Sequence, residues 1–262
     1  MAKLSLSVVM PALNEEKDIA SAIKDTLEAM DAFHIEGEVI VVNDGSTDRT
    51  GEIVAGIMAA EKRVRTIVHD RPHGIGGAFW AGVDQAAMDT VIMLPGDNEN
   101  DPQEIFRYLD LMEHVDIVIP FLYNRGVRSF FRNVVSYLYR LIINVTFLVN
   151  FNYTNGTILY RRNILTSLDI RSMSFFFQTD ILIRAIKRGY LFAEVPYKIR
   201  RREGGGSKAI SYPSLLRVMK GYLKLVRDIY FAKAKPGAAW PEDCLTGKRR
   251  GAAGCQEHKE KP

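Results

Sequence analysis

The stretch Thr90-Val-Ile-Met-Leu94-Pro95-Gly-Asp97-Asn-Glu99-Asn-Asp101-Pro102 joins an apolar run to a loop that carries three carboxylates. The apolar run is typical of a buried strand, and open α/β sheets bind ligands beyond the carboxyl ends of such strands. Asp97 and Glu99 are spaced to hold one hard divalent ion that keeps positions open for phosphate oxygens, which points to a nucleotide diphosphate substrate. The competing interpretation is a turn that starts a helix, because Asp, Asn, Gly and Pro favour turns.

Short β-branched runs alternate with amphipathic stretches on both sides of this loop, as far as Pro120. Asp101 and Pro102 supply a helix cap followed by a proline at the first helical position. The alternation predicts a βαβ series, and hence an α/β fold with a mostly parallel sheet flanked by helices. The predicted strands are 6–10, 38–42, 64–68, 90–94 and 116–119, and the predicted helices are 15–30, 47–60, 76–87 and 102–113.

The pattern changes after Pro120, where residues 129–151 form a long aromatic and aliphatic run interrupted by Arg and Asn. An arginine near the middle of a spanning helix costs roughly 2.5 to 3.5 kcal/mol on insertion scales, so we predict helices that lie at a membrane surface or pack in the core. Residues 1–233 would form one domain. Its later elements are a helix at 179–187, a strand at 190–195 and a basic amphipathic helix at 213–233, followed by a disordered tail at 234–262.

The composition is that of an ordinary globular protein, with 262 residues of which 47% are hydrophobic and 25% charged. The net charge is +4, and the basic residues gather after Arg125, which predicts anionic partners for the second half. We expect no nucleic-acid partner. The apolar stretch before Pro11 is too short for a signal peptide, so we expect a cytoplasmic protein. Cys244 and Cys255 fit neither a disulfide framework nor a zinc spacing.

Two further polar motifs follow predicted strands, which places them at the same edge of the sheet as the acidic loop. They are Pro11-Ala-Leu-Asn14-Glu-Glu16 and Val41-Val-Asn-Asp44-Gly-Ser-Thr-Asp48-Arg-Thr50. Asp44 is suited to accept a hydrogen bond from a base N–H or a ribose hydroxyl, although its motif also fits a turn with a helix cap. The glycines of His73-Gly-Ile-Gly76-Gly77 allow close approach either of a ligand or of a packing neighbour.

Together these motifs resemble the family 2 nucleotide-sugar glycosyltransferases, and within them the dolichyl-phosphate mannosyltransferase-like group. The resemblance covers roughly residues 5–230 and includes Phe177-Gln178-Thr-Asp180 and Arg202-Glu-Gly-Gly-Gly-Ser207-Lys208. It implies a GT-A fold with Mg²⁺ or Mn²⁺ as cofactor and a nucleotide diphosphate sugar as donor, GDP-mannose or a UDP-hexose. The sugar would pass, with inversion, to a polyprenyl or dolichyl phosphate.

The resemblance also implies roles for single positions. Grouped by role, they are Pro11, Asn14, Glu16 and Asp44 around the nucleoside, Asp97 and Glu99 at the metal, Arg132 and Ser136 at the acceptor phosphate, Arg202, Ser207 and Lys208 in a loop that closes over the pyrophosphate, and Gly76 and Gln178 as further donor-binding residues. The three glycines inside the late basic loop would give it the mobility of a lid.

Two segments depart from the family pattern. Pro95 stands at the first Asp of the family's Asp-x-Asp motif, and a proline cannot bind a metal, so Asp97 and Glu99 must contribute more. Pro120-Phe-Leu-Tyr-Asn-Arg125 replaces the family's Ser-Arg-Tyr. The first departure supports a rival interpretation, in which the chain is a catalytically impaired module that binds a nucleotide sugar or docks at a membrane.

The charges predict a mechanism. A phosphate acceptor is nucleophilic at neutral pH, so displacement at the anomeric carbon needs positioning by Arg132 and leaving-group stabilisation by Arg202 and Lys208 rather than a strong base. A sugar hydroxyl as acceptor would need a base, and Asp180 is the candidate; its alternative role is that of an acidic residue favoured at a helix N-terminus. The basic helices predict reversible association with the cytoplasmic face of a membrane.

Overall fold

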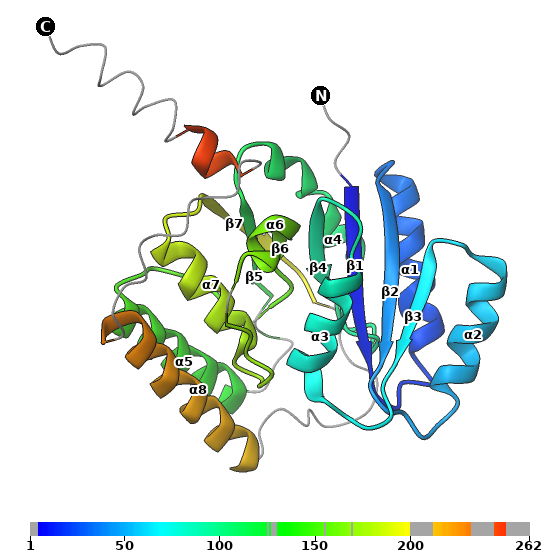
Figure 1. Ribbon diagram of the computed structural model, residues 1–262, viewed down its shortest axis with the longest axis horizontal. Helices are drawn as coiled ribbons and strands as arrows, with labels where there is room; N and C mark the ends of the chain where they lie inside the picture. The colour runs from blue at the N-terminus through cyan, green and yellow to red at the C-terminus, as the bar shows by residue number, and fades with distance from the viewer. Residues whose placement is uncertain are drawn as a thin grey trace, which may run out of the picture.

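A seven-stranded sheet in the order β3-β2-β1-β4-β6-β5-β7 lies between two helical layers (Figure 1). The computed structural model describes residues 5–124, 126, 130–154, 156–168, 170–199, 212–231 and 244–249. Among the described strands only β6 runs antiparallel to its neighbours. The strands are β1 Ser5–Ala12, β2 Glu36–Asn43, β3 Val64–Val68, β4 Thr90–Met93, β5 Ile117–Leu122, β6 Leu159–Arg161 and β7 Phe192–Tyr197.

Successive side chains of the central strands point to opposite faces, and both faces are apolar. In β1, Val8 and Met10 pack into one hydrophobic cluster and Val9 into the other. The first cluster is covered by α1 Ile19–Ala32, α2 Thr50–Ala60, α4 Pro102–Phe106 and the 3-10 helix η1 Leu109–Glu113. The second is covered by α3 Gly74–Gln85, α5 Phe130–Phe147, α6 Arg162–Thr166, α7 Phe177–Lys187 and α8 Tyr212–Tyr230.

The predicted α/β architecture is confirmed, and every predicted strand overlaps an observed one. The sequence pattern predicts neither β6 nor α6, because elements of three and five residues are too short to show a period. The single helix predicted at 102–113 is two elements, since the chain leaves α4 at Arg107 and resumes as η1. These differences do not change which loops lie at the carboxyl edge of the sheet, after β1, β2 and β4.

Helices α5 and α8 lie side by side at one end of the molecule (Figure 1). The hydroxyl oxygens of Thr146 and Tyr222 are 2.8 Å apart, and the ring of Phe147 stacks on that of Tyr230. Both helices also expose apolar side chains spaced three or four residues apart, which places them on one face of each helix. They are Val134, Leu138, Leu141, Val145 and Leu148 at α5, and Leu216, Met219 and Leu223 on α8. Within the described chain, no helix combines the length and apolarity that crossing a membrane requires.

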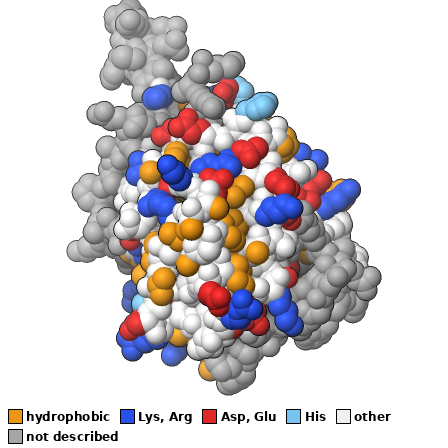
Figure 2. Space-filling view, turned by 90° about the vertical axis from the view of Figure 1, so that its right-hand side faces the viewer, with side chains coloured by type: hydrophobic (Ala, Val, Ile, Leu, Met, Phe, Trp, Pro, Cys, Tyr) orange, Lys and Arg blue, Asp and Glu red, His pale blue; other side chains and the backbone are white. Residues whose placement is uncertain are grey.

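The opposite end of the molecule is formed by α2 and the edge strand β3. Figure 2 shows hydrophobic side chains gathered in the middle of this face, with charged side chains around them. The apolar side chains exposed on α2 are all small, namely Ala55, Ala59 and Ala60. Among the described residues of α2 and β3, Val68 is the only large hydrophobic residue that is exposed.

Residues 244–249 pack against the start of β5, so the predicted disordered tail does not hold for this segment. The buried carboxylate of Asp116 accepts hydrogen bonds from the backbone N–H groups of Leu245 at 2.8 Å and Thr246 at 3.0 Å, and from the Thr246 hydroxyl. The same hydroxyl accepts a bond from the N–H of Leu191 at 2.9 Å. Apart from residues 244–249, the predicted tail lies outside the described residues.

Candidate functional site

The loops that follow β1 and β2 are joined by hydrogen bonds at the carboxyl edge of the sheet. Asn14 has a positive φ of 57°, accepts a bond from the N–H of Thr47 at 2.8 Å and donates its own N–H to the Ser46 hydroxyl at 3.0 Å. Glu16 accepts from the N–H of Arg49 at 3.2 Å. The structure therefore brings the two predicted motifs together, with Asn14 and Glu16 as the residues that connect them.

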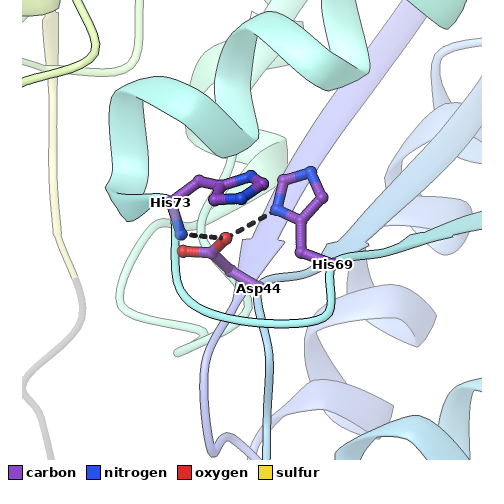
Figure 3. Close-up of side chains that lie close together, drawn as sticks. All are labelled: Asp44, His69 and His73. Carbon is purple, nitrogen blue, oxygen red and sulfur yellow. Dashed lines mark hydrogen bonds and ion pairs between the residues drawn. The ribbon is translucent and has the colours of Figure 1, made fainter.

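Asp44 lies at the end of β2 in a cluster with two histidines from the loop between β3 and α3 (Figure 3). Its Oδ1 is 2.6 Å from Nδ1 of His69 and accepts the backbone N–H of His73 at 2.8 Å, and its Oδ2 accepts the N–H of Gly74 at 2.8 Å. The carboxylate is buried, at 3% exposure. Asp44 thus anchors the start of α3 and retains acceptor capacity on Oδ2 for a ligand.

The glycine motif serves packing within the described structure. A Cβ on Gly76 would lie 2.6 Å from the backbone carbonyl of Met173, so only glycine lets α3 approach the segment before α7 this closely. Gly74 has a φ of +82°, which favours glycine at the turn into the helix. Of the two roles that the sequence left open for Gly76, close packing is the one with a contact in the structure.

The acidic loop leaves β4 at the same edge and is tied to β1, because the N–H of Gly96 donates to the carbonyl of Pro11 at 2.9 Å. Asp97 Oδ1 accepts the N–H of Glu99 at 3.2 Å, and Asn98 between them has a φ of 51°. Both acidic side chains are partly exposed at the end of a buried strand. Two carboxylates from one tight loop are a hard oxygen donor set that suits Mg²⁺ or Mn²⁺ when phosphate oxygens complete the shell.

Ser136 lines a small cavity of about 50 Å³ at the carboxyl end of β5, between α5 and the segment before β6. Its polar neighbours include Asn133 and Arg140, and Arg140 donates to the carbonyl of Asn152 at 3.0 Å. Arg132 lies in the first turn of α5, one turn before Ser136, but its side chain is outside the described part of the structure. Ser136 therefore lines a small hollow at the same edge as the acidic loop, together with polar and aromatic side chains.

Asp180 lies in the first turn of α7, whose N-terminus is at the carboxyl edge because α7 leads into β7, which is parallel to β5. Burial raises the pKa of Asp180, and the Arg184 guanidinium, 3.1 Å away, partly offsets this rise. Arg184 also bonds Asp228 of α8 at 2.9 Å. The Asp180 side chain borders a cavity of about 300 Å³ that is also lined by Arg171, Arg217, Lys220 and Lys224.

Other site residues predicted from the sequence are not brought into this edge by the described contacts. Gln178 is 1% exposed, and its Oε1 accepts the hydroxyl of Tyr160 at 3.0 Å within the core. Arg202, Ser207 and Lys208 lie outside the described residues. Their roles therefore stay predictions.

The structure adds residues that sequence reasoning missed. His69 and His73 contact Asp44 from 25 and 29 positions away, and no local pattern links them to it. The basic residues of α8 were predicted to face a membrane, whereas Lys220 and Lys224 also line the cavity beside Asp180. The regular spacing of basic residues in 213–233 predicts a basic helix, but it does not predict the cavity that this helix lines.

Residues 7–168 match the sequence profile of Glycosyl transferase family 2. The chain belongs to this family. The match includes all three edge loops, after β1, β2 and β4, together with the glycine motif. The family resemblance predicted from the motifs is thus confirmed.

Curated relatives extend the similarity beyond that profile. An undecaprenyl-phosphate 4-deoxy-4-formamido-L-arabinose transferase of Edwardsiella ictaluri is 31% identical over 208 residues, 78% of this chain and 62% of that protein. The polyprenol monophosphomannose synthase of Mycolicibacterium smegmatis is 29% identical over 217 residues, 77% of this chain and 79% of that protein. The chain therefore spans less than two thirds of the first relative and most of the second.

Solved structures confirm the GT-A fold. Glucosyl-3-phosphoglycerate synthase from Mycobacterium tuberculosis, in complex with Mn²⁺, UDP-glucose and phosphoglyceric acid, superimposes with a TM-score of 0.67 at 22% identity, over 86% of this chain and 80% of that chain. The same enzyme with Mg²⁺ and UDP gives a TM-score of 0.66 at 21% identity, over 86% and 80%. At these identities the likeness concerns the fold alone.

Proposed function

We propose that the chain is an inverting glycosyltransferase that moves a sugar from a nucleotide diphosphate sugar to a polyprenyl phosphate. The observation that carries this proposal is the convergence of the Asn14, Asp44 and Asp97 loops at one edge of a family 2 fold. The similarity to an undecaprenyl-phosphate 4-deoxy-4-formamido-L-arabinose transferase and to a polyprenol monophosphomannose synthase supports the acceptor class. The donor is GDP-mannose or a UDP-hexose.

In this proposal the loops after β1 and β2 bind the nucleoside. Asn14 and Glu16 hold the β2 loop in place, and Asp44 Oδ2 accepts a hydrogen bond from the base or ribose. Pro11 contributes through its carbonyl, which fixes the acidic loop beside the nucleoside. The three loops are cross-linked before the donor arrives, so little ordering is left to oppose binding.

Asp97 and Glu99 would hold Mg²⁺ or Mn²⁺, which when bound supplies positive charge to the diphosphate leaving group. Arg202 and Lys208, which follow β7 in the sequence, would add further positive charge. Arg132 and Ser136 hold the acceptor phosphate, and the cavity that Ser136 lines at the end of β5 supports this role. An oxygen of the acceptor phosphate attacks the anomeric carbon while the bond to the nucleotide diphosphate breaks.

The direct test is nucleotide release. The chain is incubated with GDP-mannose or UDP-hexoses and a divalent ion, with and without polyprenyl phosphate, and products are identified by mass spectrometry. A glycosylated polyprenyl phosphate with an equal amount of released nucleotide is the expected result. Donor binding without any release in the presence of acceptor would favour the impaired binding module that Pro95 suggests.

Asp180 distinguishes a phosphate acceptor from a sugar hydroxyl. A phosphate needs no base, so Asp180→Asn should lower turnover less than about tenfold, whereas loss of a general base would cost roughly 10²- to 10⁴-fold. The Asn variant keeps the shape of the side chain, and Arg184 keeps its bond to Asp228. The turnover of the variant is compared with that of the parent chain at a temperature well below the thermal midpoints of both. A loss of a thousandfold would assign the alternative function, transfer to a sugar hydroxyl.

We also propose that α5 and α8 rest on the cytoplasmic face of a membrane. Their exposed apolar stripes would enter the interface, and each Lys or Arg of α8 near an anionic leaflet adds on the order of 1 kcal/mol, screened by salt. The chain should float with anionic liposomes at low salt and detach as salt rises. If the chain stays unbound at both low and high salt, the membrane proposal is wrong, and the apolar faces of α5 and α8 pack against protein instead.

A matched pair of variants tests which end of the molecule binds. Val145→Glu on α5 should weaken liposome binding, because Val145 is 66% exposed within the apolar stripe. Val68→Glu is the control, since Val68 is 67% exposed on β3, the edge strand at the opposite end of the molecule (Figure 1). Equal effects of the two substitutions would assign liposome binding to general charge rather than to α5 and α8.

A further inference from the structure

The two histidines beside Asp44 have no part in the transfer mechanism above. His69 and His73 come from one loop, and their rings lie 4.3 Å apart, centroid to centroid, tilted by 43°. Figure 3 shows both imidazole rings beside each other over the Asp44 carboxylate. One ligand atom from each of Asp44, His69 and His73 lies within 4.8 Å of the others.

This set of donor atoms differs in kind from the acidic loop. Two imidazole nitrogens and one carboxylate oxygen suit Zn²⁺ and similar first-row transition ions, whereas Mg²⁺ prefers oxygen ligands alone. Three protein ligands leave a fourth position for water, as in open zinc sites. The cluster therefore has the chemistry of a transition-metal site that is separate from the Asp97 loop.

Two of the three ligand atoms are already in contact. Asp44 Oδ1 and His69 Nδ1 are now 2.6 Å apart, in a hydrogen bond. An ion held at tetrahedral angles, roughly 2.0 to 2.2 Å from each atom, would replace the shared proton and move the two atoms apart by roughly 0.7 to 1 Å. The N–H groups of His73 and Gly74 would continue to orient the carboxylate as outer-shell donors.

An entry path and favourable charge are also present. The His73 side chain is 46% exposed, while those of His69 and Asp44 are 11% and 5% exposed, so the cluster is buried on one side and open on the other. Asp70 lies on the open side, with Oδ1 3.9 Å from Nε2 of His73. A cation can therefore enter past His73 and meet a second carboxylate there.

We propose that Asp44, His69 and His73 form a binding site for Zn²⁺ or a similar transition-metal ion. This proposal does not depend on the proposed transferase activity, because it is tested by metal binding and not by turnover. Since Asp44 is also the proposed nucleoside contact, a bound ion would compete with the nucleotide for this carboxylate.

The test is calorimetric titration of the nucleotide-free chain with Zn²⁺, in a Cys255→Ser background that removes one competing thiol. One ion per chain should bind, and His73→Ala should weaken binding by roughly a hundredfold or more, since loss of even an outer-shell partner costs about 10- to 100-fold. His73→Ala leaves the bond between Asp44 and His69 in place, so the variant should fold. Two controls should bind Zn²⁺ normally, His114→Ala at an exposed histidine and Asp97→Ala in the acidic loop.

A second readout uses Co²⁺, whose visible absorption reports nitrogen ligands. The bands should form in the parent chain and be lost in both His69→Gln and His73→Ala, and Zn²⁺ should raise the thermal midpoint of the parent chain alone. Absence of Zn²⁺ binding by the parent chain, or binding that neither histidine substitution weakens, would overturn the proposal and leave the cluster as a hydrogen-bonded anchor for α3.

Discussion

Asp97→Ala should abolish divalent-ion-dependent sugar transfer and leave the thermal midpoint of the ligand-free chain nearly unchanged. Asp97 is partly exposed on a loop, so its loss opens no cavity in the core. If Pro95 stands where the family has an acid, as the resemblance implies, Asp97 would be the principal carboxylate for the ion. Loss of leaving-group stabilisation of this kind costs roughly 10²- to 10³-fold or more in turnover. The measurement is nucleotide release across a Mg²⁺ and Mn²⁺ series.

Asp101 provides the matched control for this substitution. It lies in the same loop, but its carboxylate caps α4 by accepting the N–H of Gln103 at 3.1 Å. Asp101→Ala should cost about 1 kcal/mol of stability, as loss of an N-cap does, and retain ion-dependent turnover. The two variants thus predict opposite patterns of activity and stability. Full activity of the parent chain in EDTA would refute the role of Asp97 as a metal ligand.

The sequence predicts the sheet edge well because strands and the loops that end them are local features. The β-branched run 38–42 predicts β2, and the polar residues after it must then lie at the carboxyl edge beside Asp97. The same reasoning places Asn14. Conversely, Gln178 shares a motif with Asp180 yet contacts Tyr160 in the core, because the two steps between them along the helix turn the side chain by about 200°.

What the sequence could not supply are contacts between distant segments. The partners of Asp44 are chosen by how the β3–α3 loop folds back, and no periodicity encodes that path. The sequence allowed Gly76 to approach either a ligand or a packing neighbour. The structure shows that the backbone of Met173, almost a hundred positions later, packs against it. Residues 244–249 have the composition of a solvated tail, and only the buried carboxylate of Asp116 explains why they pack.

Loss of the Asp116 carboxylate should strongly lower the stability of the fold. Asp116 is fully buried, lies 3.3 Å from Nε of Arg161 and accepts bonds from Leu245 and Thr246. Asp116→Ala would leave the Arg161 guanidinium without its ion-pair partner and these N–H groups without their acceptor. Breaking a buried charged pair from one side costs about 3 to 5 kcal/mol. For a chain of this size the thermal midpoint should fall by on the order of 10 °C in a calorimetric scan.

Thr246→Val isolates the share of this effect that belongs to residues 244–249. Its hydroxyl is bonded to both Asp116 and the N–H of Leu191, so the isosteric valine should cost about 1 to 3 kcal/mol by leaving buried polar groups unpaired. The exposed Asp110 is the control, because Asp110→Ala removes a carboxylate that is not buried and should change stability by less than about 0.5 kcal/mol. If residues 244–249 were disordered, Thr246→Val would change the free energy of unfolding no more than the control does. A clear loss in the valine variant therefore places the C-terminal segment within the cooperative fold, where it holds the start of β5 and, through that strand, the edge that carries Ser136.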